Sequence, residues 1–404
     1  MERHHSNLQN RKKHFWALAL FPGLPSRMLL IGLGWMLGSV LLLASCARPS
    51  LPSAESSPEQ LLDGYNAQRW YFADVPLDVP LKILKKKKIN VLADPFLLPI
   101  GNRLIVTSYN GYLVSLERFK MGDVARLRLA RGISSSPAFY RPLVFIAAEK
   151  GKFGLQAYDL LQRKIIWKKK GWFSRSSPLL KERMVLHAAL NGRVAAFNMI
   201  TGEIIWQYQS PQTVTANMAM RGDTLVFCSP NGLLTALHTL DGNPLWKMEL
   251  AHHVYAAPLI VRDRIYVADY RGSVWLVELA TGKIRAHFEA QTPFYQPCTS
   301  DGQSIFCMGS NGILRCLSLN LQEKWQRALP GVPTAPLVVT QNHLIVTTGQ
   351  KRLFVVQKDS GRVAQTIKLK RRPASAVVSG DGLVYLASEY DALFQLGKKS
   401  RRRP

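Results

Sequence analysis

A unit of about 40 residues recurs along most of this chain, and such a fixed period is typical of repeat architectures. One copy runs from Asn191 to Trp206. Asn191-Gly192 forms a tight turn because both residues tolerate positive φ; a β-rich stretch follows, Thr201-Gly202 turns the chain again, and a second strand carries Trp206. The same turns and tryptophans recur at Asn231-Gly232, Asp241-Gly242 and Trp246, at Arg271-Gly272 and Thr281-Gly282, and at Asn311-Gly312 and Trp325. Four short strands per repeat are typical of β-propeller blades.

Seven complete repeats lie in the middle of the chain, and its two ends share an eighth. The C-terminal end supplies only three strands, near Ala374–Val378, Leu383–Ala387 and Ala392–Leu396. Residues 79–88 have the pattern of a fourth strand that lacks its first three. We therefore expect one all-β domain over residues 67–397: an eight-bladed β-propeller in which an N-terminal strand completes the last blade and removes an exposed sheet edge. Helical repeats are excluded, because no segment shows a 3.6-residue period and β-branched residues dominate.

An almost uncharged run from Met28 to Ala44 follows a basic N-terminal segment, a layout typical of an export signal. The run leads into Leu-Ala-Ser-Cys46, which resembles the lipobox of bacterial lipoproteins, where the cysteine receives lipid. We expect a lipoprotein signal peptide over residues 1–45, lipid on Cys46, and an anchor and flexible linker over residues 46–66. One alternative is a single membrane-spanning helix with an incidental cysteine. A true start at Met28 would leave few positive charges ahead of the apolar run.

The chain is strongly basic, with 53 Lys and Arg against 26 Asp and Glu and a net charge of +27. Removing residues 1–45 takes away five basic residues and one acidic residue and leaves a net charge of +23. Such a surface attracts anionic partners. In a cell envelope these are lipid headgroups and phosphorylated polysaccharides, and no nucleic acid is expected. The alternative is a solvated basic surface with no dedicated partner.

Three basic runs occupy the same place in the repeat, where the last strand of one blade leaves for the next. Equivalent positions lie on one face of a propeller, so we predict that these runs form a basic patch for anionic cell-wall or lipopolysaccharide ligands. The candidate residues are Lys85, Lys86, Lys87, Lys88, Lys168, Lys169, Lys170, Lys368, Lys370, Arg371 and Arg372. The chain ends in a further basic tail over residues 398–404.

Four tryptophans recur at one phase of the repeat, near the outer strand: Trp167, Trp206, Trp246 and Trp325. A large flat ring at this position can fill the wedge between adjacent blades. A ring that stacks on a cofactor would instead have to point into the central channel, and one ring per blade does not suit that role. We therefore expect these tryptophans to pack between blades.

The motif Ala-x-Asn/Asp-x-x-Thr-Gly-x-x-x-Trp, present as Ala196 to Trp206, resembles the PQQ-type propeller repeat named after quinoprotein dehydrogenases. This repeat also builds non-enzymatic scaffolds. Eight such blades behind a lipobox resemble the BamB family of β-barrel assembly lipoproteins, and the resemblance covers residues 67–397. It implies a lipid-anchored, non-enzymatic scaffold at the outer membrane, facing the periplasm, with the barrel-assembly subunit as partner. Ala47 and Arg48 lack the Asp that retains lipoproteins at the inner membrane of enteric bacteria, which favours the outer membrane.

Two other functions stay open: a binding module for anionic envelope polymers and a PQQ-dependent dehydrogenase. The dehydrogenases need oxygen ligands for Ca²⁺, a carboxylate base and usually a vicinal cysteine pair. This chain has no Cys-Cys dipeptide and few carboxylates at strand starts. No His and Cys spacing suggests a metal site. We therefore expect no catalytic residue, no metal and no cofactor.

Beyond Cys46 the chain has four cysteines, Cys228, Cys298, Cys307 and Cys316. If Asn311-Gly312 is a two-residue hairpin turn, Cys307 and Cys316 are directly opposed, which suits a disulfide in an exported protein. Cys298 on the preceding strand competes for Cys307 in this scheme. Free buried thiols are the remaining alternative.

Overall fold

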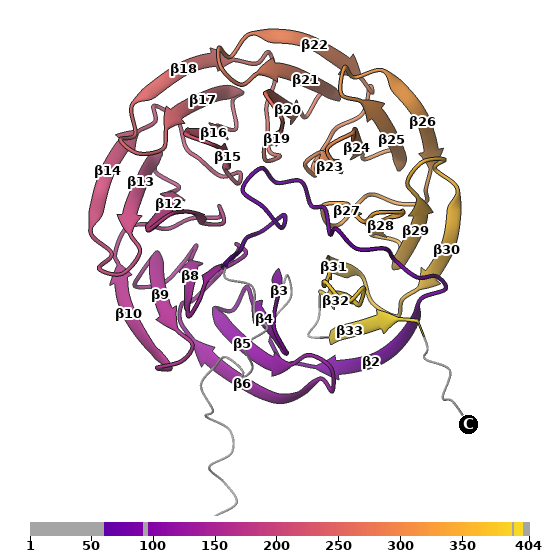
Figure 1. The fold of residues 1–404 in the computed structure, drawn as a ribbon, viewed down its shortest axis with the longest axis horizontal. Coiled ribbons are helices and arrows are strands. Elements are labelled where there is room, and N and C mark those ends of the chain that lie inside the picture. Colours follow the sequence, from indigo (N-terminus) through magenta and orange to yellow (C-terminus); the bar gives the residue numbers. More distant parts are fainter. Residues whose placement is uncertain (1–59, 92–95, 390–391, 399–404) are drawn as a thin grey trace, which may run out of the picture. The chain divides into compact units, whose positions relative to one another are not determined.

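The computed structural model describes residues 60–91, 96–389 and 392–398. These residues form a ring of eight antiparallel sheets around a central channel (Figure 1). The described ranges contain no helix. They therefore hold no helical segment that could span a membrane. The expected all-β, eight-bladed propeller is confirmed. We number the blades 1 to 7 from β3 onward, and blade 8 combines β31, β32 and β33 with β2.

Each blade has four strands of its own, counted from the channel outward, and β1 (Gln60–Leu61) adds a fifth inside β7 of blade 2. The innermost strands are β3 (Phe96–Ile100), β7 (Ala138–Tyr140), β11 (Leu179–Lys181), β15 (Ala219–Arg221), β19 (Leu259–Val261), β23 (Thr299–Ser300), β27 (Val338–Val339) and β31 (Pro373–Val378). The second strands are β4 (Arg103–Thr107), β8 (Leu143–Ala147), β12 (Met184–Ala188), β16 (Thr224–Cys228), β20 (Arg264–Ala268), β24 (Ser304–Met308), β28 (His343–Thr348) and β32 (Val384–Ser388). The third strands are β5 (Tyr112–Glu117), β9 (Leu155–Asp159), β13 (Arg193–Asn198), β17 (Leu233–His238), β21 (Ser273–Glu278), β25 (Ile313–Ser318), β29 (Arg352–Gln357) and β33 (Ala392–Gly397). The outermost strands are β6 (Gly122–Arg128), β10 (Lys164–Lys169), β14 (Ile204–Gln209), β18 (Pro244–Glu249), β22 (Ile284–Glu289), β26 (Glu323–Ala328), β30 (Val363–Lys368) and β2 (Lys82–Lys88).

The ring closes where the N-terminal strand β2 pairs with β33, as predicted from the incomplete repeats at the two ends. The seam is also tied to blade 7. The Gln365 side chain accepts a hydrogen bond from Leu81 N at 2.7 Å and donates one to Leu81 O at 2.8 Å. Closure therefore needs both ends of the chain, and it leaves no blade with a missing outer strand.

The second and third strands of each blade form the core, because both of their faces lie against other blades. In β8 and β12 every residue is buried. The outermost strands instead alternate between exposed and partly buried positions, as in β30. This change from continuous to alternating hydrophobicity is what a sheet edge at the molecular surface requires.

The recurrent tryptophans pack between blades, as expected. Trp167 in blade 2 donates a hydrogen bond from Nε1 to Met199 O in blade 3 at 2.9 Å. Its ring lies against Gly202, where an added Cβ would come within 2.6 Å of Trp167 Cδ2. Because Gly202 also has a φ of 71°, both sterics and backbone geometry demand glycine there. The same pairing joins Trp206 to Gly242, Trp246 to Gly282 and Trp325 to Gly361.

The junction between blades 5 and 6 reverses this arrangement. Ala286 in β22 occupies the tryptophan position, since it pairs with Leu276 just before the strand bulge. Leu321 takes the left-handed turn position, with a φ of 63°, and is buried in the cluster against which Ala286 packs. A small residue on one side is thus matched by a large one on the other, which keeps the wedge filled.

The two faces of the ring have different connections. On one face lie the turns that join the first strand to the second and the third strand to the fourth. We call it the plug face, because residues 62–79 cross the channel there. The mouth face carries the turns from second to third strand and the connections between blades. Lys181 shows the first grouping: its Nζ contacts Asp223 in a first turn and Thr239 Oγ1 in a third-to-fourth turn.

Candidate functional site

Residues 62–79, which we call the plug, cross the central channel on the plug face (Figure 1). Plug carbonyl groups accept hydrogen bonds from inner-strand N–H groups of four successive blades. The contacts are Ala67 O to Met220 N at 2.8 Å, Gln68 O to Ile260 N at 3.1 Å, Trp70 O to Ser300 N at 3.0 Å and Tyr71 O to Val339 N at 2.9 Å. The plug thereby satisfies donors on inner sheet edges that face the channel.

The linker expected over residues 46–66 ends earlier than predicted. β1 (Gln60–Leu61) pairs with β7 of blade 2, and Leu62 is buried in the core. Residues 60–66 therefore belong to the propeller rather than to the linker. The predicted signal peptide, Cys46 and the rest of the linker lie outside the described residues, as do residues 399–404 of the basic tail.

A buried arginine anchors the plug in the channel. Arg69 is fully buried, and its Nε donates to Met218 O at 2.8 Å and its Nη2 to Ser177 O at 3.3 Å. Its Nη1 lies 3.2 Å from Asp63 Oδ2 in an ion pair. A charge can be buried this deeply only because every side of the guanidinium finds an acceptor. Sequence analysis missed Arg69, because the plug has no repeat pattern.

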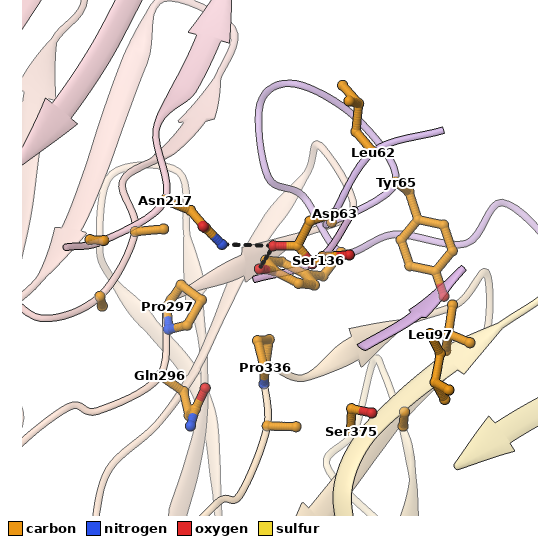
Figure 2. Close-up of a pocket in the computed structure, with 18 of the residues that line it drawn as sticks. Leu62, Asp63, Tyr65, Leu97, Ser136, Asn217, Gln296, Pro297, Pro336 and Ser375 are labelled. Atoms are coloured by element: carbon orange, nitrogen blue, oxygen red, sulfur yellow. Dashed lines mark hydrogen bonds between the residues drawn. The ribbon is translucent and has the colours of Figure 1, made fainter. Parts of the chain in front are cut away.

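Asp63 gathers polar groups around this ion pair. Asn217 Nδ2 donates to Asp63 Oδ2 at 2.7 Å, as Figure 2 shows, and Tyr71 Oη donates to the same oxygen at 3.0 Å. Burial, together with the Asp63 carboxylate, raises the pKa of Tyr71 well above its ordinary value. Its contacts with Arg69, Asn217 and Tyr71 commit the carboxylate to fixing the plug.

The channel contains a cavity of about 300 Å³ beside the plug (Figure 2). Plug residues line one part of it, and the starts of the inner strands line the rest. Labelled lining residues in Figure 2 include Leu62, Asp63 and Tyr65 of the plug and Ser136, Asn217, Pro297 and Pro336 of the blades. The exposed Tyr255 and Tyr295 and the side chain of Arg175 also line the cavity.

Exposed aromatic rings gather on the mouth face of blades 4 and 5. Tyr255, Tyr270 and Tyr295 contact one another edge to face, with ring centroids 5.7 Å apart in each pair. His253 continues the row, 6.4 Å from Tyr255. The hydrogen bond that the Tyr295 hydroxyl makes to Tyr270 raises the pKa of Tyr295 above its ordinary value.

The topology places the predicted basic runs toward the mouth-face ends of three outermost strands. Lys85–Lys88 lie in β2 of blade 8, Lys168–Lys170 at the end of β10 in blade 2, and Lys368 at the end of β30 in blade 7, followed by Lys370, Arg371 and Arg372. Blade 1 lies between blades 8 and 2 (Figure 1). Blade 1 contributes Arg128 and Arg131, and blade 2 also contributes Lys150 and Lys152. These residues were not predicted from the sequence, because they do not form runs.

A belt of exposed apolar side chains runs along the plug-face rim. Phe119, Leu161, Ile200 and Leu240 occupy the same position in the third-to-fourth turn of blades 1 to 4, and each is between 44% and 59% exposed. Their neighbours Ile165, Ile204, Ile205 and Leu245 at the starts of the outermost strands are exposed as well. We call these eight residues the apolar belt; Ile284 of blade 5 and Ile83 and Leu84 of blade 8 are also exposed near the starts of their outermost strands and lie outside it. Blades 5 to 7 have Ala280, Asn320 and Asp359 at the turn position.

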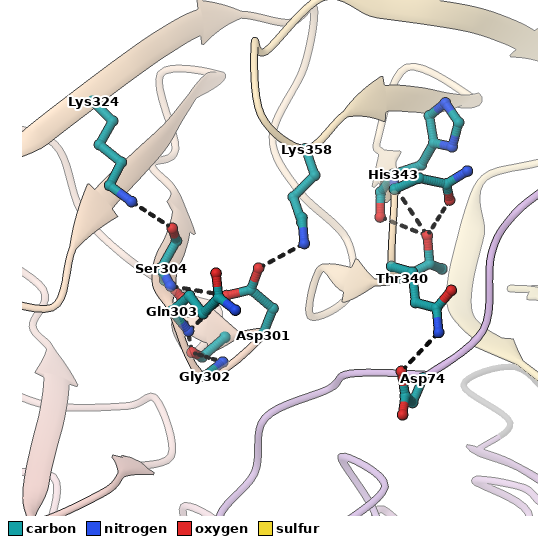
Figure 3. Close-up of polar contacts among 12 residues, drawn as sticks. Asp74, Asp301, Gly302, Gln303, Ser304, Lys324, Thr340, His343 and Lys358 are labelled. Carbon is teal, nitrogen blue, oxygen red and sulfur yellow. Dashed lines mark hydrogen bonds and ion pairs between the residues drawn. The ribbon is translucent and has the colours of Figure 1, made fainter.

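The plug face of blades 6 and 7 is instead tied together by polar contacts (Figure 3). Lys358 of blade 7 binds Asp301 of blade 6, with Nζ 2.8 Å from Oδ2. Burial would raise the pKa of Asp301, but the hydrogen bonds from Lys358 and from the N–H groups of Gln303 and Ser304 outweigh it and lower the pKa. Nearby, Gln341 donates to Asp74 at 3.0 Å and so fixes the plug.

A family model described as outer membrane protein assembly factor BamB matches residues 92–219 and 190–306, which together cover more than half of the chain. The chain belongs to the BamB family. Within that family, the protein of Legionella pneumophila is 24% identical over 200 residues, which are 46% of this chain and 51% of the relative. The protein of Shewanella oneidensis is 22% identical over 276 residues, 63% of this chain and 68% of the relative. The match thus spans about half of the first relative's length.

Solved structures show the same fold. BamB from Moraxella catarrhalis superposes with a TM-score of 0.65 at 16% identity, covering 81% of this chain and all of that chain. A europium-containing methanol dehydrogenase superposes with a TM-score of 0.71 at 11% identity, covering 85% of this chain and 99% of the enzyme. At these identities the likeness concerns the fold alone, so the BamB-family propeller and the dehydrogenase propeller must be told apart by their sites.

The cavity of this BamB-family chain does not fit a cation-held quinone. Of the described residues that line it, Asp63 alone carries a carboxylate, and that carboxylate is bound to Arg69. A quinone site of the dehydrogenase type needs free oxygen ligands for Ca²⁺. Among the described residues no group of three or more His, Cys, Asp or Glu is placed to hold a metal ion.

The predicted pairing of Cys307 with Cys316 is wrong in this BamB-family fold. Cys307 lies opposite Arg315 and Cys316 opposite Phe306, so the two thiols point to opposite faces of blade 6. The cause is the turn: Gly309 N binds Ile313 O, which leaves three residues in the loop rather than two and shifts the register by one. Cys228, Cys298, Cys307 and Cys316 are all buried free thiols.

Proposed function

We propose that this protein is a non-enzymatic scaffold of outer-membrane protein assembly. Lipid on Cys46 would hold it at the outer membrane, facing the periplasm, and the propeller would bind a protein partner, the barrel-assembly subunit. Membership in the BamB family supports this role, since its members carry that description. The plug also supports a role without catalysis, because its one carboxylate at the cavity is bound to Arg69 and its polar groups bind one another.

The apolar belt is the observation that carries the proposal. Single exposed apolar residues are ordinary on a protein surface, but a repeated one on four consecutive blades is not. The same turn position is small or polar in blades 5 to 7, so the fold itself does not require an apolar side chain there. Interface cores are formed by such apolar side chains, and we assign the belt to the protein partner.

The test compares one turn position in different blades. Full-length Ile200→Asp and Leu161→Asp variants are purified from gently solubilised envelopes, and co-purifying proteins are quantified by mass spectrometry. A buried charge at the interface should reduce recovery of the barrel-assembly subunit by about tenfold or more. Ala280→Asp in blade 5 is the matched control and should leave recovery unchanged. An equal loss of the subunit with the control variant would refute the belt as the binding surface. Absence of the subunit from the wild-type preparation would refute the assembly role.

The charge of the mouth face supports a second binding role that is compatible with the first. Blades 7, 8, 1 and 2 present basic mouth-face connections, whereas blades 4 and 5 have Glu249, Asp269 and Glu289 there. We propose that the basic half contacts phosphate-bearing envelope polymers or headgroups. The concentration of charge in consecutive blades, rather than around the whole ring, favours this role over a merely solvated surface.

Binding to vesicles containing lipopolysaccharide tests this role. Replacing Lys168, Lys169 and Lys170 with Gln should weaken binding several-fold at low salt, and the difference should shrink as salt screens the charges. Arg271→Gln on the mouth face of blade 5 should have no effect. Binding that is independent of salt, or equally weakened by both changes, would contradict the proposal.

A further inference from the structure

Two cysteines of blade 6 lie opposite each other on its two inner strands. Thr299 pairs with Phe306 and Ser300 with Ile305. One residue further along the same register, Cys298 lies opposite Cys307. Ser300 N donates to Trp70 O in the plug, which means that it points away from β24. Ser300 and Ile305 are therefore a non-hydrogen-bonded pair. Because the two kinds of pair alternate, Cys298 and Cys307 are non-hydrogen-bonded as well.

Non-hydrogen-bonded pairs bring opposite residues closest together, with Cα atoms about 4.5 Å apart, which lies within the range that disulfides span. Both side chains belong to the same buried cluster, and each is only 1% exposed. The two thiols form a hydrogen bond with each other, and that bond, with burial, raises the pKa of Cys298 well above its ordinary value. Cys316 and Cys228 have no such neighbour: Cys316 packs in the cluster on the other face of blade 6, and Cys228 lies in blade 4.

We propose that Cys298 and Cys307 are a disulfide-forming pair, and that an exported chain acquires this bond while blade 6 folds. The cellular part of the inference rests on the proposed envelope location, because that compartment supplies the oxidant. The oxidant is a thiol–disulfide oxidoreductase or a small-molecule disulfide.

The chemistry is two successive exchanges. One cysteine thiolate attacks the oxidant's disulfide, forms a mixed disulfide and releases one thiol of the oxidant. The second cysteine then attacks the mixed disulfide and releases the other thiol. The two cysteines lose two protons and two electrons, and the oxidant's disulfide gains them. Since both thiols are buried in the folded blade, the exchange takes place before β23 docks on β24.

The bond would reinforce a short inner strand of the ring. β23 has only two residues, Thr299 and Ser300. It also lies beside the junction that has Ala286 and Leu321 in place of a tryptophan and a glycine, and it receives the plug through Ser300 and Trp70. A covalent link to β24 restricts the unfolded chain and keeps the short strand in register.

The test uses the full chain refolded in a buffer of oxidised and reduced glutathione, then denatured, alkylated without reduction and digested with trypsin. No Lys or Arg lies between Arg285 and Arg315, so both cysteines fall in one peptide. We expect this peptide to lack two hydrogen atoms and to escape alkylation, while the peptides with Cys228 and Cys316 are alkylated. Cleavage before Asp301 should leave two fragments joined by the bond. Reducing the bond should lower the melting temperature by about 5 °C.

Matched variants make the assignment specific. Cys316→Ser should keep the bond, whereas Cys307→Ser should leave Cys298 fully alkylated. Full alkylation of both cysteines in the refolded wild type, or a bond between Cys307 and Cys316, would overturn the inference. Protein extracted from envelopes under acid quench should carry the same bond. A dithiol there together with a disulfide in the refolding experiment would overturn the envelope location and leave the pairing established.

Discussion

The plug and the apolar belt lie on the same face of the propeller, but their chemistry is opposite to what burial alone suggests. The centre of the plug is buried at Arg69 and is held by polar groups, above all by Arg69 and Asp63. The belt is exposed and is apolar. The plug needs polar groups because it lies against inner strands whose backbone donors and acceptors face the channel. The belt has no such structural reason, and this contrast is why we assign stability to the centre and binding to the rim.

The largest effect on stability is expected at the centre of the plug. Arg69→Met removes every hydrogen bond of the guanidinium and leaves Asp63 without its counter-charge, so we expect a loss of about 3–5 kcal/mol in the free energy of unfolding. Urea denaturation followed by fluorescence measures it. Arg271→Met, at an exposed mouth-face turn, is the control and should change stability by less than about 0.5 kcal/mol. A similar small change in Arg69→Met would show that the plug is not anchored there.

A slightly smaller effect is expected beneath the belt, at a junction between blades. Gly202→Ala forces a Cβ into the Trp167 ring at a backbone position with positive φ, so we expect a loss of about 3 kcal/mol. Gly222 also has positive φ, but an added Cβ would meet nothing within 4 Å. Gly222→Ala should therefore cost only about 1 kcal/mol from backbone strain. Equal losses in thermal unfolding would mean that the tryptophan contact contributes nothing.

The polar contact beside the plug should have a smaller and pH-dependent effect. Asp301→Asn weakens the bond to Lys358, with an expected loss of about 2 kcal/mol at neutral pH. The pKa of Asp301 is lowered in the folded state, so its stabilisation is fully present above the ordinary carboxyl pKa and is lost as pH falls through the lower folded value. Unfolding curves of wild type and variant should therefore converge below about pH 4. A difference that stays constant across this range would contradict the ion pair.

The smallest effect on stability is expected in the belt. Ile200→Asp places a charge on an exposed turn, so the free energy of unfolding should change by less than about 0.5 kcal/mol. The comparison between plug and belt becomes sharp because the same variant should have the largest effect on recovery of the partner. A variant that unfolds more easily by several kcal/mol would show that the belt is part of the fold.

The sequence predicted what is local and repeated. Turn pairs such as Asn191-Gly192 and the phase of Trp206 indicated blades, and the incomplete repeats at the two ends indicated closure through β2. It also placed the tryptophans between blades correctly. Aligning the repeats position by position could have found the belt, because Ile200 and Leu240 occupy the place that Ala280 has in blade 5.

The register of blade 6 could not be obtained in the same way. Asn311-Gly312 indicated a turn, but the hydrogen bond from Gly309 N to Ile313 O makes the loop one residue longer than the predicted two. A slip of one residue moves a side chain to the other face of the sheet, so Cys316 faces away from Cys307. The neighbour of Cys307 is Cys298, through the separate pairing of β23 with β24.

The sequence by itself determined a ring of eight blades, because each repeat carries its own turns and its own alternation of buried strands. Only the tertiary structure decided how the centre is filled. Arg69 finds its acceptors in Ser177 and Met218, 108 and 149 residues away, and no local pattern marks either of them. These groups meet only because closure of the ring brings the inner strands of all blades around one channel, where a buried charge must find partners from wherever the chain supplies them.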